Sequence, residues 1–363
     1  MKDVSNEVNL DSILDKAVNE CTLDKEEILY LLNLKTRKET DRLFAAARQI
    51  REANFSNQVF LYGFIYFSTY CRNDCTFCYY RCSNSISDRY RKTEGEIIET
   101  AKELAGTGLH LLDLTMGEDP LYFRNGKFEQ LLRTIEEVKS ITRLPIMFSP
   151  GVVPLALLPE LKRIGVDWYA CYQETHNRKL FEQLRLYQDY DERLSLKRYA
   201  HEQGFLIEEG LLAGIGESDK DIYDSFEVMK DISADQVRVM SFVPQKGTPL
   251  ENTEVLSHLK ELLIIAVMRL IFQDRLIPAS LDVDGIKGLK DRLNAGANVI
   301  TSIIPPGNGL QGVSQSTLDI QEGGRTAAGI APVLEQCSLK PATQQTYSTW
   351  LKKMKSLYQE VRV

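Results

Sequence analysis

Four of the seven cysteines, Cys71, Cys75, Cys78 and Cys82, fall within twelve residues of one polar segment. Clustered thiolates indicate a metal centre, whereas the cysteines of a secreted disulfide framework are spread along the chain. A structural zinc site usually takes four ligands as two separated pairs. A [4Fe-4S] cluster held by three thiolates leaves one iron open. The spacing therefore favours an iron–sulfur cluster on Cys71, Cys75 and Cys78, with Cys82 as a bystander and a zinc loop as the alternative.

The composition is that of a globular protein, with 43% apolar and 26% charged residues in 363. The formal net charge of −7 disfavours binding to phosphate backbones. No apolar run approaches the roughly 18 residues of a membrane helix, and residues 1–9 lack the apolar core of a signal peptide. We therefore expect a cytoplasmic monomer that binds neither nucleic acid nor membrane.

Apolar, β-rich runs alternate with amphipathic segments from residue 58 onward. The predicted strands are residues 59–68, 110–116, 145–149, 168–173, 207–213, 236–243, 276–282 and 298–304. The predicted helices between them include residues 93–106, 127–140, 178–203, 219–232 and 253–272. Eight strands alternating with helices over about 250 residues predict an α/β fold, a (β/α)8 TIM barrel. A doubly wound open sheet would show the same local pattern with fewer strands.

The barrel is predicted to carry an extension at each end. Residues 1–57 show helical periodicity and are expected to form an N-terminal helical extension. The barrel is expected over residues 58–305, and a C-terminal segment over 306–363 is expected to cap it by packing on it. In this arrangement the cysteine loop follows the first strand, at the face of a barrel where catalytic loops gather.

With Phe77 directly before Cys78, the cysteine triplet resembles the radical S-adenosylmethionine (SAM) superfamily. In that superfamily the open iron is chelated by the amino and carboxylate groups of SAM. Reduction then cleaves SAM to methionine and a 5′-deoxyadenosyl radical. The resemblance thus implies two cofactors, a [4Fe-4S] cluster and S-adenosyl-L-methionine, with Phe77 beside them.

Two loops after later strands extend the resemblance. Residues 210–217, with Gly214 and Gly216, are similar to the segment that supports the SAM adenine in the biotin synthase-like subgroup. Residues 115–120 are similar to the loop that meets the SAM amino group through backbone carbonyls, here with Met116, Gly117 and Glu118. The commonest form of that loop has glycine at the position of Met116.

Polar side chains of the fourth strand and its helix are similar to the SAM clamp of the same subgroup. The resemblance implies that Glu174 contacts the amino or ribose groups of SAM and that Arg185 pairs with its carboxylate. An arginine suits this role because its two parallel donors match a carboxylate. Arg193 and Ser149 are assigned to the same cofactor site. A solvated charge pair on a helix is the alternative for Arg185.

Within that subgroup the chain resembles the methylornithine synthase family. The similar stretches are residues 64–71, 113–120, 237–240, 276–282 and 292–302, and the resemblance spans residues 10–345. It implies an isomerase that converts L-lysine to (3R)-3-methyl-D-ornithine, the first step of pyrrolysine biosynthesis. In the implied mechanism the 5′-deoxyadenosyl radical first abstracts a hydrogen atom from lysine. The carbon skeleton then fragments, and the fragments recombine to give the product. A ferredoxin or flavodoxin is the implied electron donor.

Charged residues inside apolar strands suit lysine as substrate. Arg238 interrupts one such strand, and a buried arginine needs an anionic partner, such as the carboxylate of a substrate. Asp113 and Asp282, the latter with Ser280 on the same strand face, are candidates for the two ammonium groups. By resemblance these residues and Ser302 line the substrate pocket. An internal ion pair of Arg238 with Asp113 or Asp282 is the alternative.

Other functions are less consistent with the sequence. Another biotin synthase-like enzyme, for sulfur insertion or hydrogenase maturation, is the nearest rival, but a sulfur-donating second cluster would have only Cys171 well placed on a strand. A non-catalytic iron–sulfur or zinc protein would need neither the glycine-rich loop nor Arg238. A pyridoxal-phosphate enzyme would need a phosphate cradle, which the sequence around Lys287 and Lys290 does not suggest.

Overall fold

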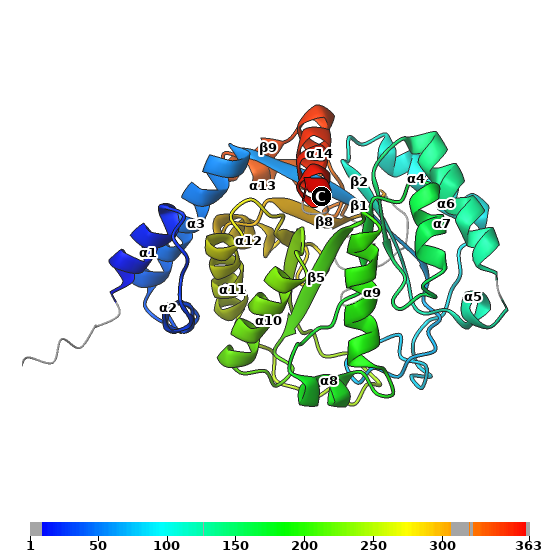
Figure 1. The fold of residues 1–363 in the computed structure, drawn as a ribbon, viewed down its shortest axis with the longest axis horizontal. Coiled ribbons are helices and arrows are strands. Elements are labelled where there is room, and N and C mark those ends of the chain that lie inside the picture. The colour runs from blue at the N-terminus through cyan, green and yellow to red at the C-terminus, as the bar shows by residue number, and fades with distance from the viewer. Residues whose placement is uncertain (1–8, 126, 306–318, 320–321, 361–363) are drawn as a thin grey trace, which may run out of the picture.

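A computed structural model of the chain describes residues 9–125, 127–305, 319 and 322–360 (Figure 1). Its centre is a parallel sheet in the order β6-β5-β4-β3-β2-β1-β8-β7. A parallel bridge between Gln236 and Leu276 joins β6 to the residues just before β7, so the sheet is a nearly closed barrel. The strands are β1 (Gln58–Ser68), β2 (Leu111–Met116), β3 (Ile146–Ser149), β4 (Trp168–Ala170), β5 (Leu206–Ala213), β6 (Gln236–Ser241), β7 (Pro278–Ser280) and β8 (Val299–Ile303).

Helices alternate with these strands, which confirms the predicted (β/α)8 fold. Those within the barrel are α4 (Glu94–Ala105), α5 (Pro120–Asn125), α6 (Phe128–Thr142), α7 (Leu157–Arg163), α8 (Arg178–Leu184), α9 (Tyr190–Glu202), α10 (Asp219–Asp231), α11 (His258–Ile271) and α12 (Leu289–Asn294). Every predicted strand overlaps an observed one, although β4 and β7 are shorter than predicted. The short helices α5, α7 and α12 were not predicted.

Side chains of β1 alternate between the two faces of the barrel wall. Leu61 and Ile65 pack outward into the main core under the helices, whereas Tyr62 and Tyr66 belong to clusters on the opposite face and line the cavity in the barrel. Gly63 faces outward, where an added Cβ would lie 2.5 Å from Leu109 Cδ1. Because successive residues of a strand face opposite sides, both faces of this long strand are buried.

The single helix predicted over residues 178–203 is wrong. The structure divides it into α8 and α9, and Asp189 caps the start of α9 by accepting from the amides of Asp191 and Glu192. Between the helices Tyr187 adopts a left-handed φ of 62°. Because the helix is interrupted here, the side chains of Arg185 and Gln188 both reach the Cys75 sulfur in the cysteine loop.

The two ends of the chain cover different parts of the barrel. The N-terminal helices are α1 (Leu10–Val18), α2 (Lys25–Leu31) and α3 (Arg37–Phe55), and α3 contacts α11. The C-terminal elements are α13 (Ala331–Gln336), β9 (Lys340–Pro341) and α14 (Gln344–Glu360). The domain limits at residues 57 and 305 stay predictions, and residues 306–318 of the predicted cap lie outside the described residues.

Helix α14 closes the barrel at the ends where its strands begin (Figure 1). Trp350 stacks on Trp168 with ring centroids 5.9 Å apart, and the hydroxyls of Tyr347 and Tyr62 lie 2.7 Å apart. Met354 is fully buried in the same cluster. The opposite end of the barrel therefore remains for a ligand. No described helix is long and apolar enough to cross a bilayer.

Replacing Met354 with alanine is expected to lower the free energy of unfolding by about 2–5 kcal/mol, because the change leaves a cavity in this packed cluster. Chemical denaturation of the purified protein measures the change. The matched control is Lys352→Ala on the exposed face of the same helix, which should change stability by less than about 0.5 kcal/mol. Equal effects of the two variants would contradict the packing described for α14.

Candidate active site

One cavity opens at the ends of the strands and reaches down into the barrel. It encloses about 1520 Å³ of space, part of it open to solvent. Sixteen of the eighteen residues singled out from the sequence line it: Cys71, Cys75, Phe77, Cys78, Asp113, Met116, Gly117, Glu118, Ser149, Glu174, Arg185, Arg193, Arg238, Ser280, Asp282 and Ser302. Gly214 and Gly216 do not line it. The fold thus brings together residues from seven strand ends that are far apart in the sequence.

The three cysteines lie in the loop after β1, at the mouth of this cavity. Burial raises the pKa of Cys71 to about 11 and that of Cys78 to about 12, so both thiols keep their protons unless a metal takes the thiolates. Cys82 is exposed and lies outside the cavity lining. Among the described residues no three His, Cys, Asp or Glu side chains converge as ligands of one metal ion. A [4Fe-4S] cluster binds each thiolate through a different iron.

Arginine side chains hold the cysteine loop in shape. Arg89 donates from its Nη1 to the carbonyls of Thr69 and Tyr80, at 2.6 and 2.8 Å, and from its Nη2 to that of Arg81. Arg81 pairs with Asp74 at 2.6 Å and lowers the pKa of that carboxyl group. The irregular backbone of the loop is therefore satisfied by side chains, as a buried loop requires.

The loop after β2 approaches the cysteine loop closely at Gly117. A Cβ at this position would lie 2.4 Å from the Tyr70 carbonyl oxygen and 3.0 Å from Cys71 Cβ. Only glycine permits this approach of the two backbones without a shift. The sequence indicated this loop as a cofactor contact, and the structure places it against the first cysteine.

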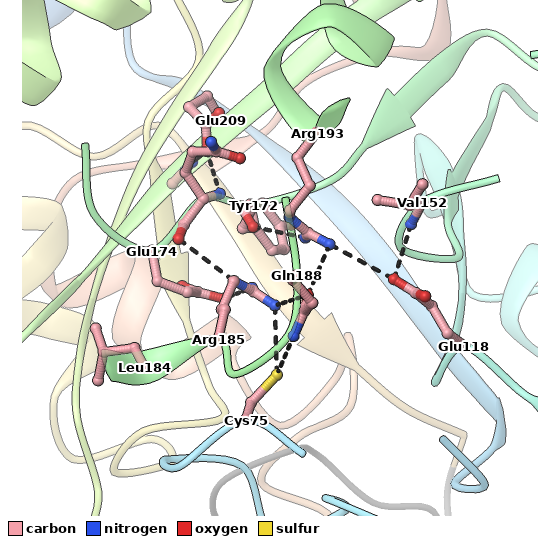
Figure 2. A network of polar contacts seen from close by, with 12 residues as sticks. Cys75, Glu118, Val152, Tyr172, Glu174, Leu184, Arg185, Gln188, Arg193 and Glu209 are labelled. Atoms are coloured by element: carbon pink, nitrogen blue, oxygen red, sulfur yellow. Dashed lines mark hydrogen bonds and ion pairs between the residues drawn. The ribbon is translucent and has the colours of Figure 1, made fainter. Parts of the chain in front are cut away.

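Glu174, Arg185 and Gln188 form a polar network that ends on Cys75 (Figure 2). Arg185 Nη2 donates to Glu174 Oε1 at 2.8 Å, and Arg185 Nη1 lies 3.6 Å from the Cys75 sulfur. Gln188 Nε2 lies 3.0 Å from the same sulfur. Burial raises the pKa of Glu174, whereas the neighbouring Arg185 opposes that rise. The predicted clamp residues therefore meet each other and the cysteine loop, and Gln188 is an addition to them.

Glu118 links the loop after β2 to three other segments of the chain (Figure 2). Its Oε2 accepts from Arg72 Nε at 2.9 Å, and its Oε1 accepts from the Val152 amide at 3.0 Å and lies 3.5 Å from Arg193 Nη1. Arg193 also donates to the Tyr172 carbonyl at 2.7 Å, while its buried Nε has no partner among the described residues. An unpartnered buried donor at a cavity wall is suited to a ligand or to water.

Gly214 and Gly216 lie in the loop after β5, outside the cavity lining. Both have a positive φ, 94° and 107°, which suits glycine. The carboxylate of Glu217 accepts from the amides of Gly214 and Ile215, at 2.7 and 2.9 Å. The glycines thus shape this loop, and their contact with a cofactor stays a prediction.

Arg238 is paired deep in the barrel with Glu208, a residue that the sequence analysis did not single out. Arg238 Nε lies 2.6 Å from Glu208 Oε1, and Tyr172 donates to Glu208 Oε2 at 2.7 Å. Glu208 lies in β5 two residues before Gly210, which is paired in register with Arg238 in β6. Among the described residues the ion pair of Arg238 is thus with Glu208 and not with Asp113 or Asp282. The sequence signal for Glu208 is the pair Glu208–Glu209 inside an apolar strand. Because successive residues of a strand face opposite sides of the sheet, one of the two must point into the barrel.

Asp282 and Ser302 meet Arg325, which the sequence analysis also missed. Arg325 is fully buried and lies 3.4 Å from Asp282 through Nη2 and 3.3 Å from the Ser302 carbonyl through Nε. The hydroxyls of Ser280 and Ser302 lie 3.3 Å apart, and Ser302 has a strained φ of 65°. Residues after the barrel therefore complete the wall of the cavity.

Asp113 lies in β2, which only β1 separates from β8, and it accepts from two hydroxyls, Thr115 and Ser149, each at 2.9 Å. Burial, with the nearby charge of Glu208, raises the pKa of Asp113 to about 7. Ser149 was assigned to the cofactor, but its hydroxyl donates to this carboxyl group. Asp113 is thus a buried carboxyl group whose ionisation a cationic ligand would favour.

Comparisons with known proteins agree with this geometry. Residues 65–229 match the model of the Radical SAM superfamily. A 3-methylornithine synthase from Methanosarcina acetivorans is 44% identical over 344 residues, 95% of this chain and 97% of the relative. A crystal structure of methylornithine synthase, also 44% identical, superposes with a TM-score of 0.89 over 93% of this chain and 99% of that chain. A hydrogenase maturase subunit from Thermotoga maritima is 29% identical over 76% of this chain and 79% of the relative.

The raised pKa of Asp113 predicts a pH-dependent difference between the ligand-free protein and its Asp113→Asn variant. A carboxyl group whose pKa is raised by folding stabilises the protein below pH 4, and this contribution is lost as the pH rises toward 7. Relative to the parent, the variant should therefore gain stability between pH 4 and pH 8, on the order of 4 kcal/mol at most. Denaturation at several pH values measures the gain.

Asp167→Asn is the matched control for this series. Asp167 is bound by Lys139 and Lys355, which lower its pKa, so the loss of its carboxylate should destabilise the protein throughout the neutral range. If Asp113→Asn changed stability by the same amount at every pH, the raised pKa of Asp113 would be contradicted.

Proposed function

The chain belongs to the 3-methylornithine synthase family of radical SAM enzymes, and from this we propose that it converts L-lysine to (3R)-3-methyl-D-ornithine in the first step of pyrrolysine biosynthesis. The observation that carries the proposal is the shared cavity. Three thiols at its mouth, and buried acids with the buried Arg238 below them, face the same space. A cofactor at the mouth would thus meet an amino acid below it.

The residues at the mouth fit a [4Fe-4S] cluster and SAM. Three cysteines leave one iron open, and the donor set around Cys75 suits a thiolate better than a neutral thiol, because Gln188 and Arg185 both direct N–H groups at its sulfur. When bound, the cluster and SAM would supply the radical abstraction of a hydrogen atom that the reaction of lysine requires. Phe77 lies under Arg185, with the guanidinium carbon 5.3 Å from the ring centroid, and shields this side of the site.

Arg185 and Arg193 are proposed to hold the polar groups of SAM. Arg185 donates from one nitrogen to Glu174 and has another nitrogen near the Cys75 sulfur. Its guanidinium group therefore lies between Glu174 and the cysteine loop. Arg193 presents on the same wall a buried Nε that has no partner in the part of the chain that the structure describes. We assign Met116, Gly117 and Glu118 to the same region, where Gly117 supplies backbone and Glu118 fixes Arg72 and Arg193.

The base of the cavity is proposed to bind lysine by its three charges. Arg238 offers a guanidinium group whose direction is set by Glu208 on one side and by the hydroxyl of Thr301 at 3.3 Å on the other. It is the proposed partner of the substrate carboxylate. Asp113 and Asp282 lie on different walls and are proposed to take one ammonium group each, with Ser280 and Ser302 beside Asp282.

These residues would act by position rather than by acid–base chemistry. A reaction that fragments and rejoins a carbon skeleton needs both fragments held in place and water kept out. Fixed charges at both ends of lysine serve the first need. Toward the second, α14 seals the cavity from below, and side chains such as Tyr66 and Phe242 line its wall.

The sulfur-insertion and hydrogenase-maturation alternatives are not favoured, because the relatives that cover nearly the whole chain at 44% identity are methylornithine synthases. Cys171 does line the cavity, but it is buried in the main core cluster. We further propose that the enzyme acts as a cytoplasmic monomer, independent of nucleic acid and membrane, and receives electrons from a ferredoxin or flavodoxin.

The reaction can be tested directly. The protein is reconstituted with iron and sulfide without oxygen, reduced, and incubated with SAM and L-lysine. The expected product is an isomer of lysine with unchanged mass and a branched skeleton, identified by NMR and mass spectrometry. Formation of 5′-deoxyadenosine with lysine unchanged would retain the radical SAM chemistry and reject the substrate.

Replacing Arg238 with lysine tests the proposed carboxylate site. The variant is expected to lower kcat/KM for lysine by about 10-fold or more. An ammonium group keeps the charge but lacks the separate donors with which a guanidinium group can hold Glu208 and a substrate carboxylate together, and a hydrogen bond to a charged group is worth about 1.5–3 kcal/mol. SAM binding should not change, since Arg238 lies at the base of the cavity. Arg51→Lys, at a buried arginine bonded to the Leu293 carbonyl outside the cavity, should leave KM unchanged. An unaltered KM in a folded Arg238→Lys variant would reject the assignment.

A further inference from the structure

Gln188 connects two buried arginines, Arg185 and Arg193, to Cys75 of the cysteine loop (Figure 2). It lies in the break between α8 and α9. Its Nε2 lies 3.0 Å from the Cys75 sulfur, and its Oε1 lies 3.2 Å from Arg193 Nη1 and 3.4 Å from Arg185 Nη1. The side chain is therefore held at both of its polar atoms.

The two arginines determine which way the amide of Gln188 faces. A guanidinium group can only donate, so the amide atom that meets two of them must be the oxygen. The amide nitrogen then faces the Cys75 sulfur. Arg193 is itself held by the Tyr172 carbonyl at 2.7 Å and by Glu118, which keeps this orientation in place even where Arg185 turns to a ligand.

The environment of Cys75 differs from that of Cys71. The Cys71 sulfur accepts from the backbone amide of Asn73 at 3.4 Å, a contact that belongs to the loop itself. Cys75 instead receives side-chain donors from a distant part of the chain, Gln188 at 3.0 Å and Arg185 at 3.6 Å. A contact of this kind can change the electronic properties of one ligand without reshaping the loop.

We propose that Gln188 is a positioning residue that acts through Cys75: its amide donates to the ligating sulfur and raises the reduction potential of the cluster. Reduction adds one electron, taken from a low-potential one-electron donor, and forms or breaks no bond to Gln188. The added negative charge is shared with the sulfur ligands, so an N–H donor stabilises the reduced state more than the oxidised state. The inference rests on the iron–sulfur cluster of the proposed function and not on lysine as substrate.

The test is a redox titration followed by EPR on the reconstituted protein without SAM or lysine. Gln188→Met keeps the length and neutrality of the side chain but removes the donor. At the midpoint potential of the parent, the ratio of reduced to oxidised cluster should fall about tenfold, which corresponds to about 59 mV for a one-electron couple. Gln183→Met, at an exposed position near the end of α8, is the matched control and should leave the midpoint unchanged.

A second variant covers the case in which Gln188→Met holds iron poorly. Gln188→Glu retains both arginine contacts and also removes the donor, so its midpoint should fall as well. A midpoint equal to that of the parent, with equal iron content, would overturn the inference and leave the proposed function intact. A parent protein that takes up no cluster would overturn both. Shifts of equal size at positions 188 and 183 would likewise overturn it.

Discussion

Buried guanidinium groups must be paired, and the active site is organised around this requirement. Arg185, Arg193 and Arg238 are all buried in the wall of the cavity, and each has a glutamate partner, Glu174, Glu118 and Glu208 respectively. A buried charge without a partner would cost several kcal/mol. Each pair joins different segments of the chain, so the pairs hold the loops at fixed positions before any ligand binds.

The parallel barrel is what allows these pairs to form. All strands of the barrel run in one direction, so residues at their carboxyl ends meet in a ring although they are far apart in the sequence. Helix α14 fills the other end with aromatic side chains, which leaves one mouth. The cysteine loop lies across that mouth, and the charged base of the cavity lies below it.

The contacts of two residues, Gln188 and Glu208, could not be predicted from the sequence. The apolar periodicity of residues 178–203 predicts a continuous helix through Gln188, whereas the cap at Asp189 starts a second helix. Glu208 stands beside Glu209 in one strand, and only the pairing of β5 with β6 shows which of them meets Arg238. Glu209 faces the other way and is bonded to Lys197. Local patterns do not specify which partner lies across a sheet.

The sequence by itself determined the eight-stranded alternation and the cysteine triplet, because strand periodicity and ligand spacing are local properties. Its resemblance to a known family pointed to sixteen of the residues that line the cavity. Tertiary structure alone decided that Arg238 pairs with Glu208, that Arg325 from beyond the barrel meets Asp282, and that Gln188 faces Cys75. Each of these contacts joins segments that become neighbours only when the sheet closes into a barrel. Their geometry depends on strand register and helix ends, which many weak interactions set together.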